Sequence, residues 1–168
     1  MGRMPTVPAV ARSTDPVISN VAIAAVFREI GDMLEILGEV VFKSVAYRRV
    51  ADAVERWPAD VAAAYRSGLP PTIPGVGAAL GAKLAELAAT GELAYHQRLR
   101  AQVPQGLLDL LAIPGLGPRT IKLLYGELGI DSVEALRAAD DSGALRGLQG
   151  MSARAQANLL AALREQGG

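Results

Sequence analysis

The stretch Ile73-Pro74-Gly75-Val76-Gly77 occurs a second time as Ile113-Pro114-Gly115-Leu116-Gly117. A short segment with helical periodicity precedes each copy and a longer one follows it, so each copy is predicted to be the turn between two helices. A weaker third copy, Leu148-Gln149-Gly150-Met151-Ser152, has serine in place of the second glycine. The sequence therefore predicts two helical hairpins and a degenerate third.

The glycine pairs indicate what these turns can bind. Glycine permits a positive φ and has no Cβ, so backbone N–H groups at the start of the second helix can face outward. Together with the helix dipole, they form an anion site that needs no basic side chain. The alternative is that both turns only connect helices, with their Ile and Val or Leu side chains in the core. Two similar copies with matched flanks favour contact with a phosphate.

The rest of the chain has the same helical periodicity, with apolar residues at three- and four-residue steps. Ser19 is expected to cap the first helix and Gly38 to end it. Helices are predicted at about 19–37, 44–57, 60–67, 80–91, 92–102, 107–112, 120–128, 132–139 and 153–164. No segment alternates like a strand, so the expected fold class is all-α.

Composition limits the class of protein. Seventeen Lys and Arg balance seventeen Asp and Glu, so any binding to a polyanion must be local. The absence of cysteine excludes disulfides and zinc-thiolate sites, and no apolar run is long enough to span a membrane. We expect a cytoplasmic protein without a membrane contact, with residues 1–17 as a disordered leader.

Several strings, in order, resemble one family. Lys43-Ser44-Val45-Ala46-Tyr47-Arg48-Arg49-Val50-Ala51, Trp57-Pro58-Ala59-Asp60, the first hairpin, Lys83 and Ala89-Thr90-Gly91-Glu92-Leu93 resemble the amino-terminal lyase domain of family X DNA polymerases. The segment from Val103 through the second hairpin to Pro118 resembles the fingers subdomain of that family. The resemblance implies two small helical subdomains, a lyase-like one at 18–101 and a fingers-like one at 102–168, each with a helix-hairpin-helix motif.

The resemblance also identifies a part that is missing. Family members continue into a palm whose aspartates hold two magnesium ions, whereas this sequence stops at Gly168. The pair Asp140-Asp141 is expected in a turn between helices and does not replace the palm. We therefore expect no polymerase activity and no nucleotide–metal site, in either a fragment of a longer polymerase or a stand-alone relative.

A second activity is implied for the first subdomain. Lys83 occupies the family position of the lysine that forms a Schiff base with a 5′-deoxyribose phosphate, and a lysine amine suits attack on an aldehyde. Lys43 and Tyr47 match positions near that pocket, where they would contact the 5′-phosphate and line the site. Glu86 is expected either to move a proton or to pair with Lys83. The alternative is that Lys83 is an exposed helix lysine.

The second hairpin carries more candidate DNA contacts than the first. The candidates in the first are Gly75, Val76 and Gly77, and those in the second are Gly115, Leu116, Gly117, Arg119, Thr120 and Lys122. The resemblance further implies that backbone carbonyls coordinate Na⁺ or K⁺ bridging to a phosphate. These belong to Ile73, Val76, Ile113 and Leu116. No zinc is expected, because His96 is the single histidine.

The sequence thus predicts a monomer that binds gapped or nicked DNA without sequence preference in DNA repair, with optional lyase activity. The alternative, of a different class, is a helical protein–protein interaction module whose hairpins pack against protein, or a DNA-binding scaffold without catalysis.

Overall fold

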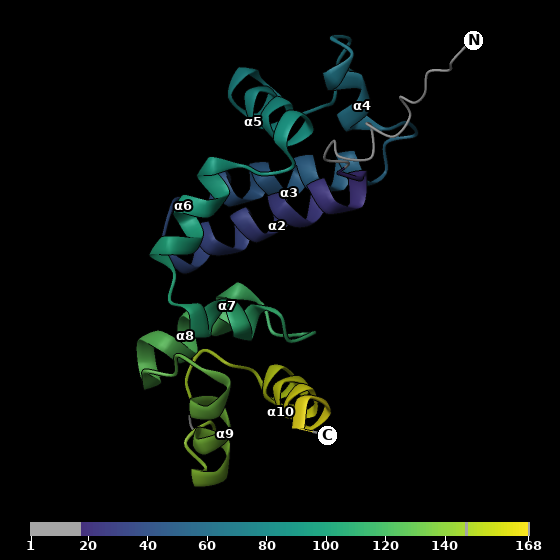
Figure 1. Cartoon of the computed structure of the whole chain (residues 1–168). Coiled ribbons are helices and arrows are strands. Elements are labelled where there is room, and N and C mark those ends of the chain that lie inside the picture. Colours follow the sequence, from purple (N-terminus) through teal and green to yellow (C-terminus); the bar gives the residue numbers. More distant parts are fainter. Residues whose placement is uncertain (1–17, 147, 168) are drawn as a thin grey trace, which may run out of the picture. The chain divides into compact units, whose positions relative to one another are not determined.

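The computed structural model describes residues 18–146 and 148–167 (Figure 1). Every regular element in these ranges is a helix, which confirms the all-α prediction. The helices are α2 (Asn20–Ile36), α3 (Val41–Glu55), α4 (Val61–Arg66), α5 (Ala78–Thr90), α6 (Ala94–Gln102), α7 (Gln105–Leu111), α8 (Pro118–Leu128), α9 (Val133–Ser142) and α10 (Ala153–Gly167). The predicted leader, 1–17, lies outside the described residues.

Local signals account for where several helices begin and end. The Ser19 hydroxyl accepts a hydrogen bond from the Ala22 N–H (3.1 Å), as the predicted N-cap of α2 should. Ser132 caps α9 in the same way through the Ala135 N–H. Gly38 and Gly91, with φ of 81° and 78°, follow α2 and α5 in the left-handed conformation that ends a helix.

Several helix boundaries differ from the sequence prediction by two or three residues. α3 begins at Val41 rather than near Ser44. α9 continues to Ser142, so Asp140 and Asp141 lie in its last turn and not in a connecting turn. Gly143, with φ of 81°, is the residue that ends this helix. Aspartate is a weak helix former, which explains why the sequence alone placed the end too early.

The described chain divides into two compact units. The first comprises the described residues up to Glu29 together with Val45–His96. Its core is aliphatic and aromatic, and α4 packs against α5. The Asn20 side chain joins the starts of two helices, because its amide donates to the Ala59 carbonyl (2.8 Å) and accepts from the Val61 N–H (3.0 Å). The first hairpin belongs to this unit.

The second unit comprises Ile30–Ser44 together with the described residues from Gln97 onward, and it contains the second and third hairpins. α7 packs against both α8 and α9 over a core of buried aliphatic side chains. Gly106 in α7 lies so close to the backbone that a Cβ there would overlap the Asp131 carbonyl oxygen. α7 therefore packs directly on the connection between α8 and α9.

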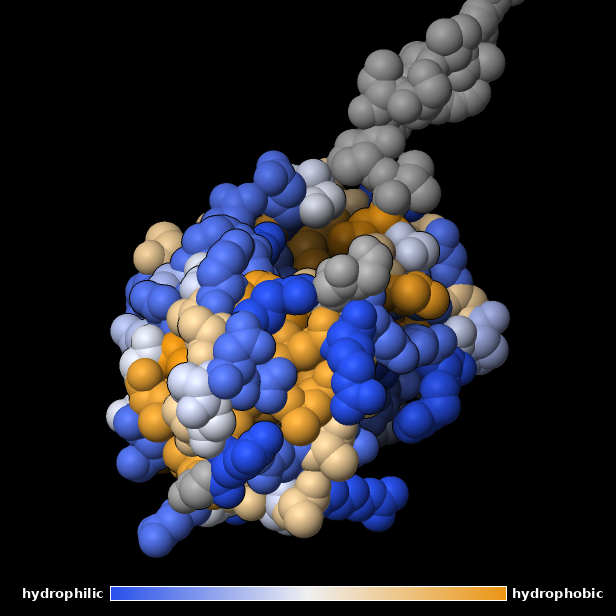
Figure 2. All heavy atoms as spheres, turned by 90° about the horizontal axis from the view of Figure 1, so that it is seen from below, coloured by the Kyte–Doolittle hydropathy of each residue, from blue (hydrophilic) through white to orange (hydrophobic). Residues whose placement is uncertain are grey.

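The surface mixes polar and apolar side chains. Figure 2 shows apolar patches bordered by hydrophilic residues on one face. The most exposed large apolar side chains include Val41 and Phe42 at the start of α3. Among the described residues, no helix is both long and apolar enough to cross a bilayer.

Candidate nucleic-acid interface

The three hairpin turns share one backbone geometry. The first glycine of each turn has a positive φ: 89° at Gly75, 86° at Gly115 and 93° at Gly150. In the first two turns, the N–H of the residue after this glycine donates to the carbonyl of Ile73 or Ile113 at 3.1 Å. A helix starts three residues after each of these glycines. The first glycine is therefore required by the turn itself, because other residues rarely adopt this conformation.

The second glycine has no such explanation. Gly77 and Gly117 have φ of −95° and −94°, in extended backbone that any residue adopts. A Cβ built on either one would meet no atom of the described protein within 4 Å. The expectation of positive φ thus holds for the first glycine of each pair only. At the second glycine, the missing Cβ leaves open space on the protein surface. The third hairpin, which has Ser152 at this position, forms the same turn.

The second glycine also leaves helix N–H groups available. Gly77 and Gly117 are the N-caps of α5 and α8, and neither helix has a side-chain cap. In contrast, the Ser152 hydroxyl accepts a hydrogen bond from the Ala155 N–H (3.1 Å) at the start of α10. The first two hairpins therefore present first-turn donors to the outside, whereas the third satisfies one of its own.

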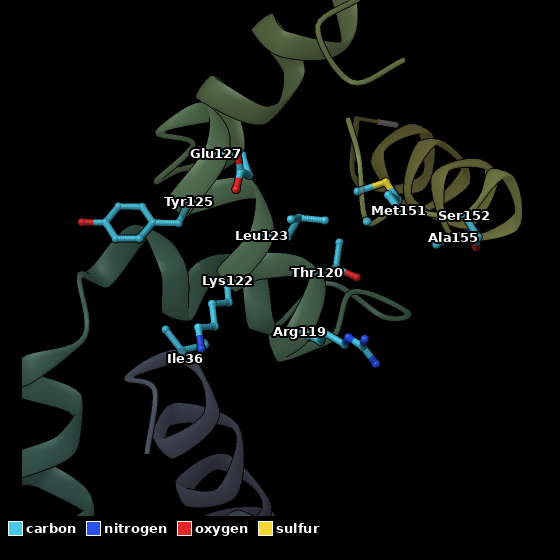
Figure 3. Close-up of a pocket in the computed structure, with 12 residues that line it drawn as sticks. Ile36, Arg119, Thr120, Lys122, Leu123, Tyr125, Glu127, Met151, Ser152 and Ala155 are labelled. Atoms are coloured by element: carbon cyan, nitrogen blue, oxygen red, sulfur yellow. The ribbon is translucent and has the colours of Figure 1, made fainter. Parts of the chain in front are cut away.

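Cationic side chains distinguish the second hairpin from the first. Arg119 and Lys122 are exposed in the first turns of α8, with the half-buried Thr120 between them. The corresponding residues after the first hairpin begin with Ala78 and Ala79, which offer only backbone. The ion pairs found within the described part of the chain do not include Arg119 or Lys122. Neither cation is therefore held by one of these ion pairs, although the Lys122 amine points toward Ile36 at the end of α2 (Figure 3).

A hollow of about 930 Å³ lies beside these residues within the second unit. Figure 3 shows Arg119 and Thr120 on α8 at one end of it, with Leu123 directed toward Met151 across the gap. Gly150 lies against Leu123, since a Cβ there would be 3.4 Å from both δ-methyls. The candidate phosphate contacts of the second hairpin therefore border a concave surface with an apolar floor.

The turn carbonyls are chemically suited to a monovalent cation. Ile73 and Ile113 each accept one turn hydrogen bond, and a carbonyl oxygen has a second lone pair. Rings of backbone carbonyls are the ligands that replace water around K⁺. The Ile73 and Val76 carbonyls in the first unit, and the Ile113 and Leu116 carbonyls in the second, are oxygen ligands of the kind that Na⁺ or K⁺ takes, and an ion at either turn stays a prediction. Within the described ranges, no group of three His, Asp or Glu residues gathers to hold a metal.

Lys83 lies against an aromatic cluster in the first unit. Its Nζ is 4.8 Å from the centroid of the Tyr95 ring, and Tyr95 stacks on Tyr47 with centroids 6.1 Å apart. Tyr47 is only 8% exposed. Burial, with Tyr95 as a neighbour, raises the pKa of Tyr47, so its phenol stays neutral. The structure brings Lys83 and Tyr47 together through Tyr95.

Two other residues from the predicted lyase site have partners of their own. The Glu86 carboxylate accepts a hydrogen bond from the Ala94 N–H (2.8 Å) and so caps the start of α6. Lys43 is exposed and pairs with Glu39 (3.1 Å), within the second unit. The lone His96 is half-buried, with its Nε2 3.3 Å from Glu29.

Two families of known sequences match the chain, one around the first hairpin and one around the second and third. Residues 18–93 match the family described as "Helix-hairpin-helix domain", and residues 107–165 match "SAM-like Helix-hairpin-helix tandem". Both matched families are helix-hairpin-helix families. The tandem match spans the second and third hairpins, so the degenerate turn at Gly150 is part of a tandem.

One curated relative extends the comparison. DNA polymerase/3'-5' exonuclease PolX of Bacillus subtilis (strain 168) is 31% identical over 134 residues, which are 80% of this chain and 23% of the relative. The chain thus spans less than a quarter of that relative's length. This match confirms the resemblance to the helix-hairpin-helix region of a family X polymerase.

Proposed function

We propose that the chain binds DNA without sequence preference, through the phosphates that lie against its Gly75–Gly77 and Gly115–Gly117 turns. The observation that carries this proposal is the second glycine of each turn, which the fold does not require and which leaves helix N–H groups open. Phosphate contacts position a protein on DNA without reading its sequence. Such donors also account for a DNA partner in a chain with a net charge of zero.

We propose that the bound DNA is a gapped or nicked duplex. We also propose that the chain is part of a polymerase-like repair protein. Each compact unit has its own glycine-capped hairpin, one with cations and one without. A gapped or nicked duplex offers two duplex arms, so that each hairpin can hold a phosphate of a different arm. Na⁺ or K⁺ at the turn carbonyls would supply positive charge at the phosphate.

We further propose lyase activity at Lys83. Its amine would attack C1′ of a 5′-deoxyribose phosphate and release water to form a Schiff base. Loss of a C2′ proton then breaks the C3′–O bond, and the electron pair leaves with the DNA phosphate. The support is the half-buried position of Lys83 over an aromatic ring beside the first hairpin. We assign no proton transfer to Glu86, whose carboxylate already caps α6.

Removal of two cations tests the DNA contact. We expect Arg119→Ala with Lys122→Ala to weaken binding to a gapped duplex and to lower the slope of log K against log salt by about 2, because each phosphate contact releases about 0.9 counterion. Fluorescence anisotropy over a salt series measures both. The matched control is Arg146→Ala with Arg164→Ala, which removes the same charge from exposed positions of the same unit.

An equal effect of the control pair would contradict the role of Arg119 and Lys122. No binding by the unaltered chain even at low salt would refute the DNA proposal and favour a protein interaction module. Tighter binding to gapped than to intact duplex is the expected result for the gap proposal, and equal affinity for both would contradict it.

Borohydride trapping tests the lyase. The chain is expected to form a covalent adduct with a 5′-deoxyribose phosphate substrate, and Lys83→Ala is expected to abolish it. Peptide mass mapping locates the modified lysine. Absence of the adduct, or an equal adduct from Lys83→Ala, would remove the lyase proposal and leave DNA binding in place.

A further inference from the structure

The Lys83 amine is held over the face of one aromatic ring. The 4.8 Å between its Nζ and the Tyr95 centroid lies within the roughly 6 Å at which a cation is attracted to an aromatic face. Lys83 and Tyr95 are each half-buried, so water screens this contact less than it would at an exposed site. The Lys83 nitrogen, which is the proposed nucleophile of the lyase reaction, therefore has the Tyr95 ring as its neighbour.

The Tyr95 ring packs on two further aromatic rings. Tyr95 and Tyr47 stack with 19° between their planes, and Tyr47 packs at 53° on Phe27, with centroids 5.5 Å apart. Phe27 is completely buried and Tyr47 nearly so. The Tyr95 ring is therefore the outer member of a series of three rings that reaches the core.

The helix that carries the ring is fixed. Ala94, the residue before Tyr95, donates its N–H to the Glu86 carboxylate at 2.8 Å. Lys83 and Glu86 lie one turn apart on α5, so α5 contacts the start of α6 at two adjacent points. This arrangement sets the height of the Lys83 amine above the ring face.

We propose that the Tyr95 ring stabilises the iminium ion that forms on Lys83. This inference rests on the proposed lyase activity. When the amine has attacked C1′ and the carbonyl oxygen has left as water, the nitrogen carries a full positive charge. Loss of the C2′ proton neutralises the nitrogen as an enamine, and breaking of the C3′–O bond restores the iminium cation, which water then hydrolyses to free the amine. The negative face of the ring attracts the nitrogen in both iminium stages, before the C2′ proton is lost and after the C3′–O bond has broken.

Three changes at one position test the electronic role of the ring. Tyr95→Phe keeps the ring and is expected to trap adduct within about twofold of the unaltered rate. Tyr95→Leu keeps apolar bulk without a ring and is expected to slow trapping about 2- to 30-fold, which corresponds to the usual strength of a cation–π contact. Tyr95→pentafluorophenylalanine keeps the ring shape but reverses its quadrupole, so it is expected to behave like Leu.

The control is Tyr65→Leu, which removes another half-buried tyrosine of the same unit. Thermal unfolding and binding to gapped duplex are measured on every sample, so a loss of fold or of DNA affinity is separated from a loss of trapping. Equal trapping by Tyr95→Phe and Tyr95→pentafluorophenylalanine would overturn the inference while the lyase proposal stands. Equal slowing by Tyr65→Leu would overturn it too. No adduct from the unaltered chain would refute the lyase and this inference together.

Discussion

At the scale of the residue, the two glycines of a hairpin turn serve different purposes. Gly75 and Gly115 have positive φ, so the turn needs them. Gly77 and Gly117 have ordinary φ and open space around them. The fold therefore does not require glycine at these positions, and we attribute it to contact with a partner. The sequence identified both pairs but could not separate these roles, because φ and neighbouring atoms are properties of the folded chain.

Stability measurements separate the two roles. Gly115→Ala places a side chain at a φ of 86° and is expected to lower the free energy of unfolding by about 1–2 kcal/mol. Gly117→Ser introduces a good N-cap at ordinary φ and is expected to change it by only a few tenths of a kcal/mol. Urea denaturation measures both. A large destabilisation by Gly117→Ser would mean that the fold does require this glycine.

Side-chain partners were the least predictable feature at this scale. The sequence offered Glu86 as a partner of Lys83, but the carboxylate caps the next helix, and Tyr95 takes the place beside the amine. Gly91 ends α5 in the left-handed conformation, and α6 starts after it. Helical spacing predicts neighbours within one helix, and it gives no information on contacts across such a turn.

At the scale of the element, periodicity and capping residues predicted the helices well. Ser19 and Ser132 cap the helices that follow them, and Gly91 ends α5 as expected. The errors lie at helix ends, such as the last turn of α9, which holds two aspartates although aspartate is a weak helix former. The close packing of Gly106 on the Asp131 backbone has no signature in the sequence, because it joins segments that are distant along the chain.

Two helical glycines provide a matched test of this packing. Gly106→Ala is expected to destabilise the second unit by about 1–3 kcal/mol, because its methyl group overlaps a backbone carbonyl. Gly126→Ala, in α8 where an added Cβ meets nothing, is expected to stabilise the chain by about 0.5–1 kcal/mol. Thermal or urea unfolding distinguishes the signs. If Gly106→Ala were neutral, α7 would not pack as described.

At the scale of the whole molecule, a net charge of zero is compatible with a DNA partner only if the contacts are local. The order of motifs predicted two helical units with a hairpin in each. It did not predict that residues 30–44 belong with the second unit, since compactness depends on contacts between distant segments. Backbone donors at two turns, assisted by Arg119 and Lys122, are the local contacts that we propose.

The most direct test of that proposal is the affinity of the double variant Gly77→Ser with Gly117→Ser for a gapped duplex, measured beside its unfolding curve. We predict a chain as stable as the unaltered one, with affinity about tenfold lower or more, because hydrogen bonds to a charged group contribute about 1.5–3 kcal/mol. The reverse change, Ser152→Gly, is the control and should not weaken binding. Unchanged affinity of a folded double variant would contradict the claim that these turns hold DNA phosphates.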